Sequence, residues 1–457
     1  MKTRGRDQFG PSSRLSGIGV LAIILIVIIV GLVAWTFKRW EGQAPQITMD
    51  RELKAVGKNP ELNVSVADMG SGLDHVTVRL KQKDSEIILV DEALKQAPSK
   101  TYDLGKMLAA QPKLEAGPTT LTIEAVDHAL LRFFSGNTAS LNKTFTVDVT
   151  PPTLEVFSAQ HYINQGGSEC VVYRVSEDAE VTGVQVGPHF FPGFPVSKSD
   201  PKVRFALFAL AYDQAPDTKI QVVARDAAGN ESTAGFWQKV FPQKFRSRDI
   251  PIDDNFLNKV VPEILSHTPS IKNTGDLSKV FVDINSNLRR QNHATIAELA
   301  KASPGQFLWN GSFVQLSNSQ VESYFADRRT YVYKGQKIDA QDHVGFDLSV
   351  TKHYPIEAAN DGKVVLADYF GIYGNTVIID HGAGLMTLYG HLSSIDVKPG
   401  QMVKKKEPVG KSGETGLAGG DHLHFGMFLH GVPVDPREWW DAKWIKDHVL
   451  DRLSQSN

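Results

Sequence analysis

Apolar residues are not spread evenly along the chain, and the most concentrated run lies near the N-terminus. Residues 17–37 are uncharged and nearly all apolar, and at about 1.5 Å per helical residue such a run is long enough to span a bilayer. It exceeds the apolar stretch of about 7–15 residues that is typical of signal peptides, and no small-x-small cleavage motif follows it. The pattern therefore predicts a transmembrane anchor over 17–37.

The residues that flank this run predict its orientation. Residues 1–16 carry four basic side chains and one acidic side chain, and Lys38 and Arg39 follow the run. The excess of positive charge before the run favours an N-terminus in the cytoplasm. We therefore expect a cytoplasmic tail over 1–16 and the rest of the chain outside the cytoplasmic (inner) membrane, attached through a single helix.

Beyond the apolar run, short stretches of alternating apolar and polar residues indicate β-strands. They recur between turn residues over 43–149, for example at Leu62-Asn-Val-Ser-Val66, and again over 150–242. Each region is typical of a β-sandwich, and the turn-rich end Arg225-Asp-Ala-Ala-Gly-Asn230 resembles bacterial immunoglobulin-like modules. We predict two sandwich modules, which act either as spacers or as binding modules.

The periodicity becomes helical over 253–303. Apolar residues recur there at helical spacing after Asp253 and Asp254, which can cap a helix. Strand patterns return over 305–440, and helical spacing returns over 441–457. The predicted fold class is therefore mainly β: a transmembrane helix, two β-sandwich modules, a helical linker or regulatory segment, an all-β domain and a C-terminal helix.

The composition indicates a globular protein and narrows its chemistry. The 457 residues are 22% charged, with a formal net charge of -2, so nothing indicates the basic surface that nucleic-acid binding requires. Cys170 is the single cysteine, which excludes an intramolecular disulfide and a cysteine-based zinc cluster. We expect its thiol to be buried. Histidine stands out instead, because seven of the 14 histidines lie between 343 and 430.

The histidines of this region lie at spacings that suit a metal ion. His422 and His424 are two residues apart, so on a strand both side chains point to one face. His343 and Asp347 are four apart, which on a straight strand is about 13 Å and too far for two ligands of one ion. The chain must bend between them, and Gly345 can supply the bend. Zinc readily accepts neutral imidazole and carboxylate as ligands.

Three motifs follow one another in this region: His-x-x-x-Asp, Tyr-Gly-His-Leu and His-Leu-His-Phe. In this order they resemble the motifs of the lysostaphin/LytM-type zinc endopeptidases, and the similarity covers the all-β domain. The resemblance implies one Zn2+ per catalytic domain, with His343, Asp347 and His424 as ligands. It also implies catalytic roles for the two other histidines of the motifs, His391 and His422.

Amide hydrolysis needs an activated water, a polarised carbonyl and a proton for the leaving amine. We favour His422 as the base that accepts the proton of the water and His391 as the side chain that stabilises the oxyanion, a division that sequence alone leaves open. Asn375 and Tyr389 are further candidates for substrate binding. Asn375 lies at a recurring position of the family, and its alternative is a structural role in a turn. For Tyr389 the single argument is that its side chain would lie on the strand face that leads to the site.

The resemblance and the predicted anchor together imply a membrane-anchored zinc metalloendopeptidase that hydrolyses peptide cross-links of peptidoglycan. Its expected partners are peptidoglycan peptide stems, the cytoplasmic membrane through one helix, and a divisome or wall-synthesis protein. The peptide bond that it cuts stays open.

Two other functions share features with this region. A non-catalytic activator of cell-wall amidases uses the same fold but loses zinc ligands, and a biotinyl or lipoyl carrier shares the hairpin of Val397–Val409 but has no use for the histidines. The helical segment 253–303 either packs on the catalytic domain or covers its zinc site, as upstream segments can in related enzymes.

Overall fold

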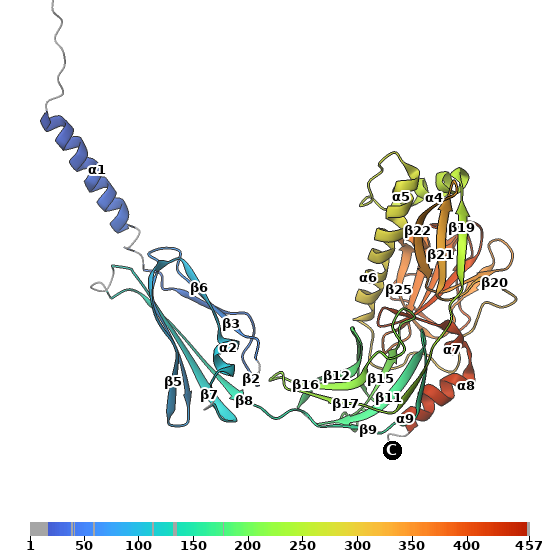
Figure 1. Ribbon diagram of the computed structural model, residues 1–457, viewed down its shortest axis with the longest axis horizontal. Coiled ribbons are helices and arrows are strands. Elements are labelled where there is room, and N and C mark those ends of the chain that lie inside the picture. Colours follow the sequence, from blue (N-terminus) through green and yellow to red (C-terminus); the bar gives the residue numbers. More distant parts are fainter. Residues whose placement is uncertain are drawn as a thin grey trace, which may run out of the picture. The chain divides into compact units, whose positions relative to one another are not determined.

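The computed structural model describes residues 17–37, 40, 42–57, 60–111, 114–130, 135–176 and 178–454, and Figure 1 shows its elements as a ribbon. The chain divides into two compact units: residues 1–150 with 227–230, and residues 151–226 with 231–457. Strands dominate both units, which confirms the mainly β class. The cytoplasmic tail predicted for 1–16 lies outside the described residues.

Helix α1 spans Gly17–Phe37 and is 21 residues long. Its side chains are described at 21–31 and at Val33, and all of these are exposed. Among the residues that the structure describes, no helix is both long enough and apolar enough to cross a membrane. The anchor predicted over 17–37 is thus confirmed as a helix and unsupported as a membrane span.

In the described part of the first unit, two sheets pack around one apolar core. In β7 (Gly117–Asp127), the central strand of the larger sheet, buried positions alternate with half-buried ones, as its apolar residues Leu121, Ile123 and Ala125 require. The smaller sheet has the order β1 (Gln46–Met49), β3 (Asn63–Ala67), β6 (Ser99–Asp103), and a short helix α2 (Leu104–Ala109) follows it. The larger sheet has the order β2 (Ala55–Val56), β8 (Thr138–Val147), β7 (Gly117–Asp127), β4 (Leu73–Gln82), β5 (Ser85–Ala97).

A second pair of sheets begins the other unit. Its buried strand β11 carries Cys170, whose side chain is fully buried as expected; burial raises the pKa of this thiol well above its ordinary value. One sheet has the order β14 (Phe194–Pro195), β15 (Val203–Ala209), β11 (Ser168–Val175), β9 (Leu154–Val156). The other has the order β13 (His189–Pro192), β12 (Ala179–Val186), β16 (Ile220–Asp226), β17 (Glu231–Ala234), and a parallel pair β10 (His161–Asn164) and β18 (Gln238–Phe241) adjoins them.

The histidine-rich region forms one large antiparallel sheet with two smaller sheets. The large sheet has the order β20 (Gln320–Ser323), β23 (Phe346–Ser349), β31 (Leu423–Leu429), β27 (Leu385–Leu392), β26 (Asn375–Asp380), β25 (Gly362–Tyr369), β29 (Met402–Val403), with β32 (Val432–Val434) paired to β31. One small sheet is β24 (Pro355–Glu357), β30 (Pro408–Lys411), β28 (Ser394–Ile395). The other is β19 (Ser247–Ile252), β21 (Asp327–Tyr333), β22 (Gln336–His343), in which β19 and β21 run parallel.

Helices make up most of the segment 253–303, as its periodicity predicts. Asp253 caps α4 (Asp254–His267) by accepting from the backbone N–H of Phe256, and Asp276 caps α5 (Leu277–Asp283) in the same way. A turn of π-helix, Ile284–Leu288, joins α5 to α6 (Arg289–Ala300). In Figure 1 these helices lie alongside β21 and β22, and their apolar faces share a core with Tyr331 and Phe428.

Four short helical pieces close the described part of the chain and pack on the second sandwich. They are α7 (Pro436–Trp440), α8 (Ala442–Ile445), the π-turn Lys446–Leu450 and α9 (Asp451–Ser454). Glu438 of α7 accepts from the Ser168 backbone N–H at 2.7 Å and from Asn164 Nδ2 at 3.0 Å. Trp439 Nε1 donates to Ser168 Oγ at 3.1 Å.

One hydrophobic core continues from this sandwich into the histidine-rich region. The rings of Phe205 in β15 and Phe307, for example, lie 5.0 Å apart between centroids. The second sandwich and the histidine-rich region therefore fold as one body, which is a physical argument against a freely hinged spacer at this position.

The buried carboxyl group of Glu438 gives this contact a pH dependence. Burial raises the pKa of Glu438 from 4.5 to about 8. The folded protein then retains a proton that the unfolded chain releases, so the free energy of unfolding decreases as the pH rises between about 5 and 8. We expect the Tm to fall over this range and the fall to flatten in Glu438→Gln, whose amide cannot ionise. An equally steep fall in the variant would contradict the assignment.

Candidate metal centre

Three side chains meet at the edge between the large sheet and the β21–β22 pair. His343 ends β22, Asp347 lies in β23 and His424 lies in β31. His343 Nε2 is 2.9 Å from Asp347 Oδ1 and 2.9 Å from His424 Nδ1, and the last two atoms are 3.0 Å apart. All three side chains are buried, and together they form a group that could hold a metal ion.

Strand pairing explains why these residues meet. β23 and β31 are antiparallel neighbours, and their register puts Asp347 directly opposite His424. The chain leaves β22 at His343 and enters β23 at Phe346, so it bends at Gly345 as expected. A Cβ atom on Gly345 would lie 2.5 Å from the backbone oxygen of Phe425, and glycine is therefore needed where the bend presses against β31.

The protonation pattern of the group fits a bound cation. His343 Nδ1 lies 3.0 Å from the backbone oxygen of Tyr324; because a carbonyl only accepts, Nδ1 carries the proton and Nε2 presents a lone pair. This lone pair, the carboxylate of Asp347 and Nδ1 of His424 converge on one another. His424 Nε2 is buried without a hydrogen-bond partner among the described residues. A set of two imidazoles and one carboxylate, with further room for a water, is what catalytic metal sites use.

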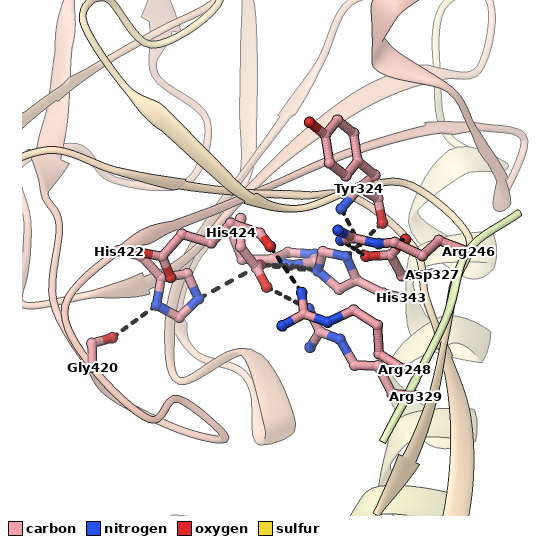
Figure 2. A network of polar contacts seen from close by, with 11 residues as sticks. Arg246, Arg248, Tyr324, Asp327, Arg329, His343, Gly420, His422 and His424 are labelled. Atoms are coloured by element: carbon pink, nitrogen blue, oxygen red, sulfur yellow. Dashed lines mark hydrogen bonds and ion pairs between the residues drawn. The ribbon is translucent and has the colours of Figure 1, made fainter. Parts of the chain in front are cut away.

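Two more histidines face this group from one side. His391 Nδ1 donates to the Thr415 oxygen at 2.8 Å and His422 Nδ1 to the Gly420 oxygen at 2.7 Å. Their ring centroids are 4.9 Å apart, and His422 Nε2 lies 3.5 Å from Asp347 Oδ1. The carbonyl contacts hold Nδ1–H of both rings, so that Nε2 of each ring is the nitrogen turned towards the site. Figure 2 shows His422 approaching the ligand group in this way.

Burial and charge give the two histidines opposite tendencies. Burial, with His422 nearby, holds the pKa of His391 well below its ordinary value. Burial also acts to lower the pKa of His422, but the carboxylate of Asp347 outweighs it and the pKa is raised. Burial by itself would raise the pKa of Asp347, because it disfavours the ionised carboxylate. The charges of His343 and Arg329 outweigh burial and hold this pKa well below its ordinary value. Asp347 is therefore ionised, His391 is neutral, and His422 accepts a second proton more readily.

Two arginines approach from the other side, and sequence reasoning gave neither a role. Arg329 Nη2 donates to Asp347 Oδ2 at 2.5 Å. Arg248, in β19, pairs in register with Arg329, and its Nη1 donates to the Glu322 oxygen at 3.0 Å. In Figure 2 the two side chains run together towards the ligand group. The parallel pairing of β19 with β21 joins segments about 80 residues apart, and no local pattern announces it.

Arg246 supports the ligand His343 through two intermediates. Its Nε donates to Asp327 Oδ1 at 3.0 Å, and Asp327 Oδ2 accepts from the Tyr324 backbone N–H at 3.1 Å. The oxygen of Tyr324 then accepts from His343 Nδ1. The guanidinium also lies over the Tyr324 ring, 4.9 Å from its centroid (Figure 2). These contacts fix the orientation of the imidazole, as outer-shell partners of metal ligands do.

The helical segment supports the ligand His424. His293 Nε2 and the Tyr373 hydroxyl are 3.0 Å apart, and the Tyr373 ring centroid is 5.3 Å from that of His424. Asn292 Oδ1 accepts from the Ile372 backbone N–H at 3.1 Å. These contacts reach the site from its flank; a covering role for 253–303 stays a prediction.

The structure treats the two predicted substrate-binding residues differently. Tyr389 is buried, and it lies opposite Phe425 in the register of β27 and β31, on the other face of the sheet from His424. Its predicted place near the site is therefore wrong. The strand face does not continue to His391, because His391 adopts a positive φ of 62°. Asn375 Nδ2 donates to the Leu392 oxygen at 3.1 Å, which agrees with the turn role; its contact with substrate stays a prediction.

Comparisons with known proteins agree with this geometry. Residues 341–436 match the family model described as Peptidase family M23. The peptidoglycan DD-endopeptidase ShyA of Vibrio cholerae is 41% identical over 93 residues, which are 20% of this chain and 22% of that protein. An uncharacterized metalloprotease of Haemophilus influenzae is 38% identical over 119 residues, 26% of this chain and 24% of that protein. The DD-carboxypeptidase/endopeptidase Mpg of Neisseria meningitidis is 38% identical over 94 residues, 21% and 22% of the two chains.

Solved structures are similar to part of the chain. A putative peptidase M23 from Pseudomonas aeruginosa, 23% identical, covers 61% of this chain and 95% of its own, with a TM-score of 0.39. The catalytic domain of lysostaphin from Staphylococcus simulans, 27% identical, covers 29% and 98%, with a TM-score of 0.25. This chain spans about a quarter of the length of the curated relatives. Residues 341–436 therefore form a domain similar to those of Peptidase family M23.

The support of His343 by Arg246 leads to a prediction on metal affinity. In Arg246→Met the aliphatic stem stays but the contact with Asp327 is lost, so the imidazole is less well oriented. We expect the affinity for Zn2+ to fall by about tenfold, measured by competition with a chromophoric chelator. Arg225→Met, which removes an arginine–carboxylate pair with Glu231 that lies away from the metal centre, should leave the affinity unchanged. Equal affinities in the two variants would refute the role of Arg246.

Proposed function

We propose that the chain is a membrane-anchored zinc metalloendopeptidase that hydrolyses peptide cross-links of peptidoglycan, with its catalytic domain outside the cytoplasmic membrane. The observation that carries the proposal is the complete set of five side chains around one point. Three of them, His343, Asp347 and His424, would hold the zinc, and two, His391 and His422, face it with Nε2.

The donor set supports zinc as the metal. Two neutral imidazoles and one carboxylate suit Zn2+ and leave a position for water or substrate. When bound, the metal would supply Lewis acidity, which lowers the pKa of a water and polarises the scissile carbonyl. One ion per catalytic domain follows from the single group of this kind with histidine ligands among the described residues.

The two remaining histidines divide the proton transfers. Neutral His391 has its proton on Nδ1, held by the Thr415 oxygen, so its Nε2 can accept the proton of the attacking water. His422, next to the carboxylate of Asp347, holds a proton on Nε2 more readily and can donate to the oxyanion and to the leaving amine. This division reverses the one favoured from sequence, because a stabilising donor needs a proton on Nε2, and the single N–H proton of neutral His391 is on Nδ1.

Peptidoglycan as the substrate is supported by the similarity to proteins named peptidoglycan DD-endopeptidase and DD-carboxypeptidase/endopeptidase. Peptide stems carry free carboxylates, and the exposed side chain of Arg248 lies beside the site with a single carbonyl contact described. A guanidinium has donors in a fork that fits a carboxylate. Arg248 is therefore a candidate for binding the stem next to the scissile bond.

The argument for attachment to the cytoplasmic membrane comes from the sequence: residues 17–37 are uncharged and nearly all apolar, and basic residues precede them. Wall substrate lies on the outer side of that membrane, where a divisome or wall-synthesis protein would be a partner. Cell fractionation tests the anchor: deletion of 17–37 should release the chain from the membrane fraction, and a wild-type chain found only in the soluble fraction would refute it.

The decisive comparison is between the full chain and its His343→Ala variant, both purified in detergent. We expect about one equivalent of zinc in the wild type and much less in the variant, because a ligand is lost. Release of soluble muropeptides from purified peptidoglycan should be abolished in the variant. Circular dichroism checks that both chains are folded.

Other outcomes favour other functions. Zinc without cleavage in the wild type would indicate a covered site or a different substrate, and the segment 253–303 would then be the part to displace. A folded wild type with neither zinc nor cleavage would rule out the enzyme and favour the amidase activator.

Separate substitutions of the two non-ligand histidines test the proton transfers. His391→Ala and His422→Ala should keep their zinc and lose about 10²–10⁴-fold in kcat, because proton transfer is lost while the ligands remain. His353→Ala is the matched control, since His353 is exposed and its contact is with Asp421; it should behave like the wild type. Loss of zinc in His391→Ala would make that residue a ligand instead.

A further inference from the structure

A three-residue loop, Glu414 to Gly416, lies between helix α4 and the histidine proposed as base. The oxygen of Thr415 accepts from His391 Nδ1 at 2.8 Å. The Thr415 hydroxyl donates to the Leu392 oxygen at 2.9 Å and accepts from the Asn375 backbone N–H at 3.0 Å. The position of this one carbonyl therefore fixes both the tautomer and the orientation of the His391 ring.

Helix α4 contacts the loop on both sides of Thr415. Glu263 Oε1 accepts from the Gly416 backbone N–H at 2.8 Å, and Lys259 Nζ lies 2.7 Å from Glu414 Oε2. Lys259 and Glu263 are four residues apart, so they share one face of the helix. The two contacts clamp the loop from residues that lie outside the segment matched to the family model.

The two contacts differ in strength. Lys259 and Glu414 are both exposed, and an exposed pair of this kind contributes little, because solvent screens the two charges. Glu263 is half-buried, its bond to Gly416 is charge-assisted, and it also accepts from the Tyr369 hydroxyl at 3.3 Å. Glu263 is therefore the main contact.

Close packing on the far side transmits the position of Glu263 to the loop. Gly416 has a φ of +70°, and a Cβ atom there would lie 2.4 Å from the Gly374 nitrogen and 2.7 Å from the Ile372 oxygen. The loop is thus confined between α4 and the turn at 371–374. Loss of the contact with Glu263 would remove the restraint on the α4 side, and we expect the loop to shift away from that turn together with the Thr415 carbonyl.

We propose that Glu263 is a positioning residue for His391, acting through the Gly416 N–H and the Thr415 carbonyl. The proposal rests on the proposed function of His391 as base. It gives the helical segment 253–303 a role in building the active centre: the helix holds the loop that sets the proton-accepting nitrogen.

The test compares Glu263→Ala with Glu263→Gln in the zinc-loaded full chain. Two-dimensional ¹⁵N NMR of histidine-labelled protein reports the tautomer of His391, assigned with His391→Ala. In Glu263→Ala we expect the pure Nδ1–H pattern to become a mixture, and kcat on peptidoglycan to fall about tenfold, with KM and zinc content unchanged. Glu263→Gln keeps an acceptor at Oε1 and should restore both the tautomer and kcat.

Glu298→Ala is the matched control, because it removes an exposed glutamate of the same helical segment that pairs with Lys301; it should match the wild type. An unchanged His391 tautomer and kcat in Glu263→Ala would overturn the proposal, as would equal losses in the Ala and Gln variants. If the wild type does not cleave peptidoglycan, the proposed function fails separately, and the NMR pattern still decides whether Glu263 sets the ring of His391.

Discussion

The pairing of β23 with β31 is the interaction on which the candidate centre depends. It sets Asp347 directly opposite His424, and it does so inside the protein, where a carboxylate is costly unless it is paired. Arg329 from β21 meets the second oxygen of Asp347, and His343 arrives from β22 to meet the first. A single step in the register of these strands would turn Asp347 to the other face and dismantle the group.

Contacts with the backbone orient the histidines around this group. His343, His391 and His422 each donate Nδ1–H to a backbone carbonyl, so loop backbone sets the tautomer of every ring except His424. The loops in turn are held by side chains from elsewhere: Arg246 through Asp327, and Glu263 from helix α4. The segment that matches the family model contains the ligands. Part of the support for their orientation comes from two earlier segments: the stretch just before β19, which holds Arg246, and the helical segment 253–303, which holds Glu263.

The position of Tyr389 differs from the one predicted from the alternation of residues along its strand. Alternation along a strand predicts a shared face only while the backbone stays extended. The positive φ of His391 breaks this alternation near the end of β27, so Tyr389 and His391 do not share a face. The register of β27 and β31 puts the tyrosine with Phe425 on the opposite face, where its hydroxyl accepts from the Ala359 backbone N–H. Asn375, the other residue predicted to bind substrate, contacts Leu392 and Thr415, the residues next to His391 in the strand and in the loop that holds its ring.

The sequence by itself determined the mainly β class, the helical period of 253–303, the buried thiol of Cys170 and the set of histidines and aspartate at metal-like spacings. These are local properties, since periodicity and motif spacing are written in neighbouring residues. The tertiary structure decided which distant segments complete the centre: Arg248 beside Arg329, Arg246 behind His343, and Glu263 behind His391. Such contacts depend on parallel strand pairing and helix docking across 80 to 150 residues of chain, and the side chains on each segment carry no mark of the partner that folding brings to them.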